Sequence, residues 1–439
     1  MTRFNYTLLT LCLNLLPAII FGQCTLPTGT YDPYITASSG AMAPILSGEN
    51  IQINSDFDID DNTEWQNCNV ALTDGITITV KSTYTLEINS GTLLSPKTDF
   101  WVGIVIEPNA TLIVESSTIC GAETAVNSVN LGSATAANFI ITNSSLLSNE
   151  TGLAVTNYTV GTHPGIFEGN TIAGPLTLTG SNSEYGIEIS SVGNATVGMD
   201  IGGGTTNNTI QDLPIGIEIT NSTVNVRQTN FVDIQPLDPA LNGTAIRATT
   251  QAAAELNIGG GAAFACSFED CQFGIDVSGY TTVNINDNSF TSTAVGLQSN
   301  AVDARSTLNT LNISDNTIDR YTDIAIDIDQ SNLSMMRVRA NNITGNLGNT
   351  RGINVDEHTG ELDLNFNVIS DVFRGIITQS VNLSGASGVI GDNIIHFDHA
   401  GTGPFAAGIL IVESDDVLIP NNDVFGNCIT GACTNIRGI

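Results

Sequence analysis

The chain has 439 residues, with 44 acidic side chains against 12 basic ones, so its formal net charge is −32. This charge disfavours nucleic acids and anionic lipid surfaces as partners, because both are repelled by it. Only 13% of the residues are charged, whereas 41% are hydrophobic, and Asn, Thr and Ser fill most polar positions. These short polar side chains suit strands and tight turns rather than helices.

Residues 1–23 have the pattern of a secretory signal peptide, with a basic start and the apolar stretch Leu8–Phe21. We expect cleavage after Gly22 or Gln23. A lipoprotein signal needs a small residue before Cys24, where Gln23 stands, so this alternative ranks second. No later apolar run is long enough to span a membrane. The sequence therefore predicts a secreted protein, extracellular or at the cell surface, that is monomeric.

Export to an oxidising compartment permits disulfides among the remaining cysteines. Spacing favours three pairs and leaves Cys120 over: Cys24 with Cys68, Cys266 with Cys271, and Cys428 with Cys433. No CxxC pair or His/Cys cluster indicates zinc.

The dominant pattern is an internal repeat of roughly 27 residues. One phrase recurs: an apolar residue, two further residues, a small polar residue, one residue, and a second apolar residue. An example is Ile313-Ser-Asp-Asn316-Thr-Ile318. We call the small polar position the slot. It is occupied by Ser117, Ser144, Asn170, Asn208, Thr229, Cys266, Asn288, Asn316, Asn341, Asn367, Asn393 and Asn422.

A second phrase, Gly-Ile-x-Ile, alternates with the first. It begins at Gly103, Gly186, Gly216, Gly274, Gly352 and Gly408, with a close variant at Ala325. Two longer intervals between the phrases contain Pro175–Tyr185 and Gln235–Gly243, which we expect to be loops that protrude from one side.

Each phrase predicts a short strand with apolar residues inside and polar residues outside. One coil cannot bury its apolar face alone, so coils stack about 4.8 Å apart and form parallel sheets. We place the slot at a turn, where stacked Asn amides bond to one another and tolerate a left-handed backbone. Glycine before Ile-x-Ile fits a second sharp bend.

Three segments follow from the repeat: the signal peptide at 1–23, an N-terminal cap with the first strands at 24–100, and a parallel β-helix at 101–439. Ile51-Gln-Ile53 and Phe57-Asp-Ile59 in the second segment alternate as strands but lack the repeat. Because Gly438-Ile439 begins another Gly-Ile phrase, we expect the β-helix to be truncated at its C-terminus.

The chain is similar to a known family in several segments, namely Phe100–Ile106, Ala110–Ile119, Ala125-Val126 and the two repeated phrases. With them the chain resembles secreted right-handed parallel β-helix proteins of the pectate-lyase-like superfamily, a type common among Bacteroidota surface proteins. The resemblance covers residues 76–439 and implies an all-β, right-handed parallel β-helix (a solenoid) of about twelve coils with an N-terminal cap. Members include lyases, glycosidases, epimerases and adhesins, so no single activity is implied.

The outward x of Gly-Ile-x-Ile stacks into a row on the surface. In chain order we expect this row to be Val105, Ala154, Glu188, Glu218, Arg247, Asp276, Gln298, Asp327, Asn354, Ile377 and Leu410. A second row two residues further on contains Ser190, Thr220, Thr249, Ser278, Asn300, Asp329, Asp356, Gln379 and Val412. The middle coils therefore carry an acidic stripe between apolar ends.

Carboxylates one coil apart repel each other, so either a cation such as Ca²⁺ lies between them or the pKa of one rises. Candidate Ca²⁺ ligands are Glu188, Glu218, Asp327, Asp329 and Asp356. Candidate catalytic residues are Asp327, Asp329, Asp356, Asp276 and Arg247. The resemblance implies paired acids for a glycosidase, and Ca²⁺ with a basic residue for a lyase; Arg247 is the one base we place in the row. A simpler interpretation is that these acids are solvated strand residues.

Two observations weigh against an enzyme. The polygalacturonase set Asn-Thr-Asp, Asp-Asp, Gly-His-Gly and Arg-Ile-Lys is incomplete, and the lyase-type Arg-x-Pro-x-x-Arg is absent. His396-Phe-Asp398-His399, expected in a loop, is the one place with two neighbouring imidazoles. We therefore predict a non-catalytic scaffold for adhesion or for contact with a polysaccharide, cell-surface or matrix component. The alternative is a polysaccharide lyase or glycoside hydrolase that uses the acidic stripe.

Overall fold

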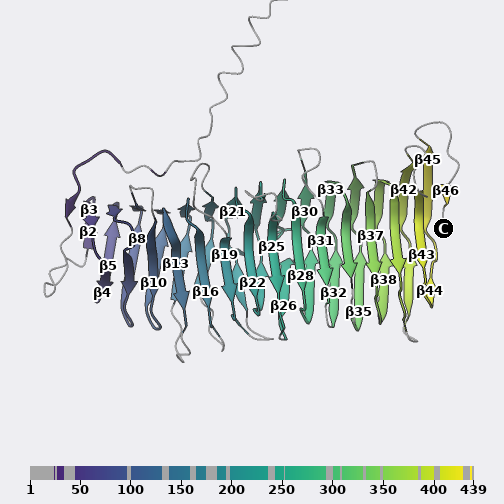
Figure 1. Cartoon of the computed structure of the whole chain (residues 1–439), viewed down its shortest axis with the longest axis horizontal. Helices are drawn as coiled ribbons and strands as arrows, with labels where there is room; N and C mark the ends of the chain where they lie inside the picture. The colour runs from purple at the N-terminus through teal and green to yellow at the C-terminus, as the bar shows by residue number, and fades with distance from the viewer. Residues whose placement is uncertain are drawn as a thin grey trace, which may run out of the picture.

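A computed structural model of the protein describes residues 24, 27–33, 45–95, 100–130, 138–158, 165–174, 185–193, 198–235, 243–251, 253–292, 300–306, 309–329, 333–346, 350–383, 387–399, 406–428 and 436–437. At 398–399, 427–428 and 436–437 it describes the backbone alone. This part of the chain is all-β and folds into a parallel β-solenoid, seen from the side in Figure 1 as a long stack of arrows. It contains no helix long and apolar enough to cross a membrane.

Each coil contributes one strand to each of three sides of the solenoid, and consecutive coils pair in parallel. Sheet A has 16 strands: β1 (Asp32–Pro33), β3 (Asn50–Ile53), β6 (Asn69–Leu72), β9 (Thr92–Leu94), β12 (Thr118–Cys120), β15 (Ser145–Leu147), β18 (Thr171–Ala173), β21 (Asn208–Gln211), β24 (Thr229–Val232), β27 (Ser267–Glu269), β30 (Ser289–Thr291), β33 (Thr317–Tyr321), β36 (Asn342–Gly345), β39 (Val368–Val372), β42 (Ile394–His399) and β45 (Asp423–Cys428).

Sheet C, the second side, has 15 strands: β4 (Phe57–Ile59), β7 (Thr77–Val80), β10 (Trp101–Ile106), β13 (Ala122–Val129), β16 (Thr151–Thr156), β19 (Tyr185–Ser190), β22 (Ile215–Thr220), β25 (Thr244–Thr249), β28 (Phe273–Ser278), β31 (Asn300–Arg305), β34 (Ile324–Asp329), β37 (Arg351–Asp356), β40 (Arg374–Gln379), β43 (Ala406–Val412) and β46 (Ile436–Arg437).

The third side is divided between two sheets that follow one another along the chain. Sheet B has six strands: β2 (Ile45–Ser47), β5 (Thr63–Gln66), β8 (Thr85–Asn89), β11 (Thr111–Glu115), β14 (Asn138–Thr142) and β17 (Gly165–Glu168). Sheet D has nine: β20 (Met199–Ile201), β23 (Val224–Val226), β26 (Glu255–Gly259), β29 (Thr282–Asn286), β32 (Thr310–Ser314), β35 (Met335–Arg339), β38 (Glu361–Asn365), β41 (Gly388–Gly391) and β44 (Val417–Leu418).

The twelve predicted slots directly precede or begin twelve successive strands of sheet A, β12 to β45, which confirms the repeat and the parallel stacking. Strands earlier than residue 101 pair in the same sheets, so the solenoid architecture begins before the start of the repeat. Ile51, Ile53, Phe57 and Ile59 are buried there, as their alternation predicts. The handedness of the coil and the capping role of residues 24–100 stay predictions.

Side chains inside the solenoid stack in columns, because in-register strands place equivalent residues above one another. In sheet A one column contains Phe231, Phe268 and Phe290, all fully buried. Their rings are stacked, with centroids 5.0 and 4.4 Å apart. Trp65 and Trp101 are also fully buried, as core packing predicts.

The slot asparagines form a buried ladder at the corner that leads into sheet A. Asn367 Oδ1 accepts hydrogen bonds from the backbone N–H (3.1 Å) and the side-chain amide (3.0 Å) of Asn341. Its own amide donates to the carbonyl of Val338 (2.9 Å) and to Asn393 Oδ1 (3.0 Å). Each amide thus satisfies polar groups of neighbouring coils that would otherwise be buried without partners.

The left-handed backbone lies one residue before the slot, and not at the slot as we predicted. Asp315, Ala340, Phe366 and Asp392 have φ between 53° and 61°. The slot residue itself must point its side chain into the corner, so the residue ahead of it makes the reversal.

Gly103 has a φ of 129°, as a sharp bend before Ile-x-Ile predicts, but the other glycines of the Gly-Ile-x-Ile phrase have a different role. Gly352 does not have a positive φ. A Cβ there would lie 2.6 Å from the carbonyl oxygen of Gly375 on the next coil, so the glycine permits close approach of two backbones.

The disulfide pairing differs from the prediction. Cys24 is bonded to Cys120, and Cys68, Cys266 and Cys271 are buried free thiols. Cys266 precedes strand β27 and Cys271 follows it, and their buried thiols donate to different carbonyls of the preceding coil, that of Val226 (3.5 Å) and that of Phe231 (3.8 Å). Cys433 lies outside the described residues.

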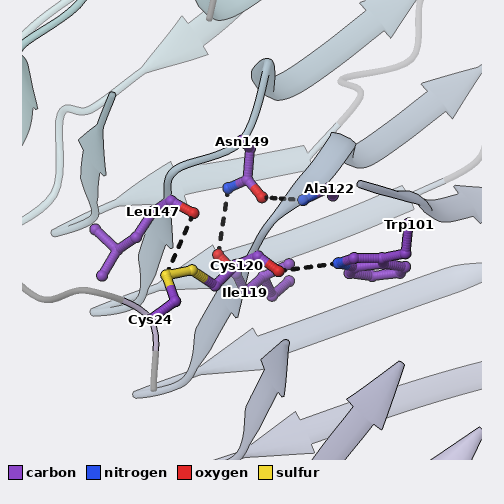
Figure 2. Close-up of a disulfide and its surroundings, with 7 residues drawn as sticks. All are labelled: Cys24, Trp101, Ile119, Cys120, Ala122, Leu147 and Asn149. Carbon is purple, nitrogen blue, oxygen red and sulfur yellow. Dashed lines mark hydrogen bonds between the residues drawn. A yellow bond between two sulfur atoms is a disulfide. The ribbon is translucent and has the colours of Figure 1, made fainter. Parts of the chain in front are cut away.

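The disulfide attaches the start of the described chain to the last residue of β12 (Figure 2). Around it, the Trp101 indole donates to the carbonyl of Cys120 (2.9 Å), and Asn149 donates to that of Ile119 (3.2 Å). The half-cystine Cys120 is almost fully buried, as are its equivalents Leu94 and Ala173 on nearby coils.

The asparagine ladder gives a first prediction. Asn367→Ala leaves the N–H of Asn341 and the carbonyl of Val338 buried without partners, so we expect it to lower the free energy of unfolding by about 3 kcal/mol. Asn342→Ala is the control, because Asn342 is exposed on strand β36 beside the ladder, and its effect should stay within about 0.5 kcal/mol. Urea denaturation checks both; equal effects of the two variants would contradict the role of the ladder.

A second prediction concerns the disulfide, which spans 96 residues. Closing a loop of this length in the unfolded chain stabilises the folded state by about 4 kcal/mol. We expect Cys24→Ser and Cys120→Ser to shift the urea midpoint downward by the same amount, and the double variant to add nothing further. Cys68→Ser, which breaks no disulfide, is the comparison. Additive effects of the two single substitutions would show that the two sulfurs act separately.

Candidate functional site

The outer face of sheet C carries a continuous row of polar side chains across seven adjacent strands. Strand register aligns Glu188, Glu218, Arg247, Asp276, Asp303, Asp327 and Asn354. Apolar or small residues flank this row, namely Ala154 before it and Ile377 and Leu410 after it. The prediction of an acidic stripe between apolar ends is therefore confirmed in outline.

One coil of the predicted row is wrong. Asp303, and not Gln298, lies between Asp276 and Asp327, and Arg305, not Asn300, occupies the second row between Ser278 and Asp329. Gln298 lies outside the described residues. The row thus gains an acid and the site gains a second base.

Strand β31 was missed because it lacks the Gly-Ile phrase. It reads Asn300-Ala-Val-Asp303-Ala-Arg305, where an alanine stands at the glycine position of the phrase and Ala304 takes the place of the larger Val277 and Ile328. The available signal was the alternation of small apolar and polar residues, which places Asp303 outward.

Ion pairs neutralise much of the first half of the row. Arg247 Nε donates to Glu218 Oε2 at 2.5 Å. Arg305 binds Asp303 through two nitrogens and lies 3.9 Å from Asp276. Asp303 is nearly buried beneath this guanidinium, with 8% of its side chain exposed. Arg247 is therefore held in an ion pair, and a guanidinium does not deprotonate in proteins, which argues against Arg247 as a catalytic base.

In the second half of the row, fewer of the carboxylates are paired with a base. The Asn354 amide donates to Asp327 Oδ1 (2.8 Å), and strand register sets Asp329 beside Asp356 in the second row. One carboxylate oxygen of Asp356, Oδ1, is buried without a hydrogen bond. The structure thus brings Asp327, Asp329 and Asp356 together, as predicted, and places Asp276 two strands away.

Two arginines are the first residues of adjacent strands of sheet C, β37 and β40. Arg351 and Arg374 are register partners on β37 and β40. Burial lowers the pKa of Arg374, and the adjacent charge of Arg351 lowers it further. The Arg374 guanidinium also lies 5.6 Å from the Phe373 ring, within range of a cation–π contact. The sequence pattern did not single out these arginines, since they precede the Gly-Ile phrase.

Burial raises the pKa of three carboxyl groups in the row. For Glu218 the neighbouring Arg247 offsets part of the effect, and for Asp276 the charge of Asp303 adds to it. Burial is also the largest cause of the raised pKa of Asp327, where the hydrogen bond from Asn354 acts in the opposite direction. These carboxyls are therefore held partly out of water.

The five predicted Ca²⁺ ligands do not form one group. Glu188 is five strands from Asp327 in the sheet order, about 24 Å at the usual strand spacing. Within the ranges that the structure describes, no three His, Cys, Asp or Glu side chains are grouped so that they could hold a metal ion. Calcium binding stays a prediction.

Three other features lie away from this row. His396 lies on strand β42, not in a loop as predicted, and its ring stacks on Phe425 at 4.8 Å. Burial raises the pKa of the Cys266 thiol to about 12, so this thiol stays protonated at neutral pH. An open cavity of about 540 Å³ lies at the end of the solenoid and is lined by Ser387, Gly388, Ile411, Ser414, Asp416, Val417 and Leu418.

No protein-family model and no curated protein matches this chain. Among solved structures it is similar to the periplasmic alginate epimerase AlgG, with 12% identity and a TM-score of 0.30, over 83% of this chain and 78% of that one. A mutant of AlgG matches with 9% identity and a TM-score of 0.28, over 86% and 77% of the two chains. A likeness at this level does not bear on the activity of this chain.

The raised pKa values set the sign of a pH dependence. A carboxyl with a higher pKa in the folded chain stabilises the fold most below its unfolded pKa, and this contribution is lost as pH rises through the folded pKa. Asp327→Asn removes the charge and keeps the oxygen that accepts from Asn354. We expect its melting temperature to exceed that of the wild type at pH 7, with the difference disappearing below about pH 4.

Thermal unfolding across this pH range measures the effect. Asp423→Asn, on the exposed face of strand β45, is the matched control and should match the wild type throughout. A lower melting temperature of Asp327→Asn at pH 7 would show that the carboxylate stabilises the fold.

Proposed function

We propose that this protein is an exported, non-catalytic scaffold that binds a neutral polysaccharide along the outer face of sheet C. The observation that carries the proposal is the unbroken row from Glu188 to Asn354 on seven parallel strands. At the usual strand spacing this row is about 29 Å long. An oligosaccharide of several residues, laid along the solenoid axis, would follow it.

The chemistry of the row suits sugar hydroxyls. Carboxylates and amides offer paired acceptors and donors, and hydrogen bonds to charged groups are the stronger ones. Arg247, Arg305 and Asn354 already hold their carboxylate partners in place. Side chains that are fixed before binding lose little conformational entropy when the ligand arrives.

The charge of the row favours a neutral polymer over an acidic one. Acids outnumber bases on this face: the central row has five acids and Arg247, and the second row has Asp329, Asp356 and Arg305. A uronate or sulfate chain along this row would face repulsion at most positions.

Export and family membership are part of the proposal. The signal-peptide pattern supports export to the cell surface or the medium, and the three-sided parallel solenoid with its asparagine ladder supports the pectate-lyase-like superfamily. The disulfide of Cys24 also bears on the lipoprotein alternative, because a sulfur bonded to Cys120 cannot carry a lipid thioether. We therefore favour a secreted protein without a lipid anchor over a lipid-anchored one.

A second candidate, a glycoside hydrolase or polysaccharide lyase, is favoured by one group of residues. Asp327 has a raised pKa and lies one strand from Asn354, with Asp329 and Asp356 adjacent in the second row. Two carboxyl groups that lie close together on one face are the arrangement that glycosidases use. Asp276 and Arg247 are engaged in or near ion pairs and are weaker candidates.

Binding and turnover can be measured on the same panel of polysaccharides. We expect the wild type to bind a neutral glucan, xylan or mannan in affinity electrophoresis, and to bind polygalacturonate and alginate more weakly. The double variant Asp327→Ala/Asn354→Ala should lose at least about tenfold in affinity, as expected for the loss of a charge-assisted hydrogen-bonding pair. Asn257→Ala/Asn284→Ala on the outer face of sheet D is the control and should bind normally.

Two outcomes would decide against this proposal. Release of reducing ends or unsaturated products that Asp327→Ala abolishes would establish the enzyme instead. Equal loss of binding in the control variant would place the glycan elsewhere on the molecule.

A further inference from the structure

A second set of polar residues lies on the outer face of sheet D, the third side of the solenoid. Asp200, Asn225, Asn257 and Asn284 form a ladder in which each amide donates to the preceding side chain, at 2.6, 2.8 and 2.7 Å. The next residue, Asn312, donates instead to Asn286 (3.2 Å) in the adjacent row. The ladder therefore ends at Asn284 on β29, two strands before Arg337 on β35.

Strand β35 places two arginines on this face, Arg337 and Arg339. Arg337 is the register partner of Asn312 on one side and of Asp363 on the other. Asp363, with 9% of its side chain exposed, is already bound by Arg339 and by the Asn365 amide (2.6 Å). Both neighbours of Arg337 are thus committed to other partners.

The Arg337 guanidinium makes no hydrogen bond or ion pair with any residue in the part of the chain that the structure describes. It is half-buried, and its Nε–H, like that of Arg339, is buried without an acceptor. A buried donor without an acceptor lowers the stability of the fold, and a partly buried charge without a partner lowers it further. Arg247 and Arg305 on sheet C, in contrast, each bind an acid.

We propose that Arg337 and Arg339 form a binding site for a tetrahedral oxyanion, a sulfate or phosphate group. An oxyanion above β35 would accept from the Arg337 fork, and a small turn of that side chain would bring its Nε–H onto the same ligand. Bidentate guanidinium contacts of this kind are the usual means of oxyanion recognition.

The spacing of the two arginines favours a tetrahedral ligand over a planar carboxylate. Residues two apart on one strand lie about 6.6 Å apart, with both side chains on one face. A carboxylate has two oxygens, which one guanidinium fork occupies fully. A sulfate or phosphate presents further oxygens to the second arginine, whose own fork is shared with Asp363. The net negative charge of the chain opposes the anion only locally, because salt screens charges more than about 8–10 Å away.

The test compares sodium sulfate, sodium phosphate, sodium acetate and sodium chloride at matched ionic strength, with thermal unfolding and calorimetric titration as readouts. We expect sulfate or phosphate to stabilise the wild type beyond chloride, and acetate, which only one guanidinium fork can bind, to stabilise it less than sulfate does. Arg337→Gln should weaken the affinity at least about tenfold and keep only the general, non-specific effect of sulfate. Without added anion it should unfold no more readily than the wild type, because no hydrogen bond or ion pair is lost.

Two further variants sharpen the result. Asp363→Asn removes a competing acid and releases the Arg339 fork, so it should bind sulfate more tightly. Arg320→Gln is the matched control, since Arg320 is exposed on sheet A and pairs weakly with Asp319 at 3.6 Å; it should bind as the wild type does. Equal sulfate stabilisation of wild type and Arg337→Gln would overturn the site, as would an equal response to acetate.

A sulfated oligosaccharide and its desulfated form identify the source of the anion. Tighter binding of the sulfated form than of inorganic sulfate assigns the site to an ester on a glycan, whereas equal affinity assigns it to the free anion. Because this site lies on sheet D, its result is independent of binding along sheet C.

Discussion

The whole solenoid depends on the in-register parallel pairing of each coil with the next. Pairing places each side chain about 4.8 Å from the equivalent side chain of the next coil. A residue type therefore stabilises the stack only if it packs or bonds well with a residue at the same position. Aromatic rings meet this condition by stacking, as Phe231, Phe268 and Phe290 do. Amides meet it by donating to one coil and accepting from another, as Asn341 and Asn367 do. This is why a polar residue can be buried at every turn of the corner.

Charged residues cannot stack on their own kind without cost, and the outer face of sheet C shows the consequences. Where a base follows an acid, the pair neutralises itself, as Glu218 does with Arg247. Where acids follow one another, burial and mutual repulsion raise the pKa of a carboxyl, as at Asp276. Because bases pair with the acids mainly in the first half of the row, the carboxylate oxygens with fewer partners lie near Asp327 and Asp356. Recognition of hydroxyl groups would therefore centre on these coils.

The positions that stack from coil to coil could be predicted from the sequence repeat. Contacts that depend on the length of a loop or on the path of the chain could not. All twelve slots align because the corner admits few residue types. Asp303 was missed because small residues replace the expected phrase in β31 and the preceding interval differs in length. The Cys24–Cys120 disulfide joins segments far apart in sequence, and equal spacing in Cys266/Cys271 hid the extended strand between them. The left-handed residue of each turn was also predicted one position too late. Asn422 and its equivalents point inward, and the residue before each of them reverses the chain.

Arginine shows how position in the stack decides the role of a side chain. The register that pairs Arg247 with an acid one coil below is the same kind of register that sets Arg337 between Asn312 and an already occupied Asp363. A solenoid cannot relieve such a residue by local rearrangement, because moving one strand would break its pairing with two neighbours. An unpartnered cation on this scaffold therefore persists at a cost to stability, which a bound anion would remove. On a chain with so few basic residues, that cost is the physical argument for recognition on the face of sheet D, separate from the acidic face of sheet C.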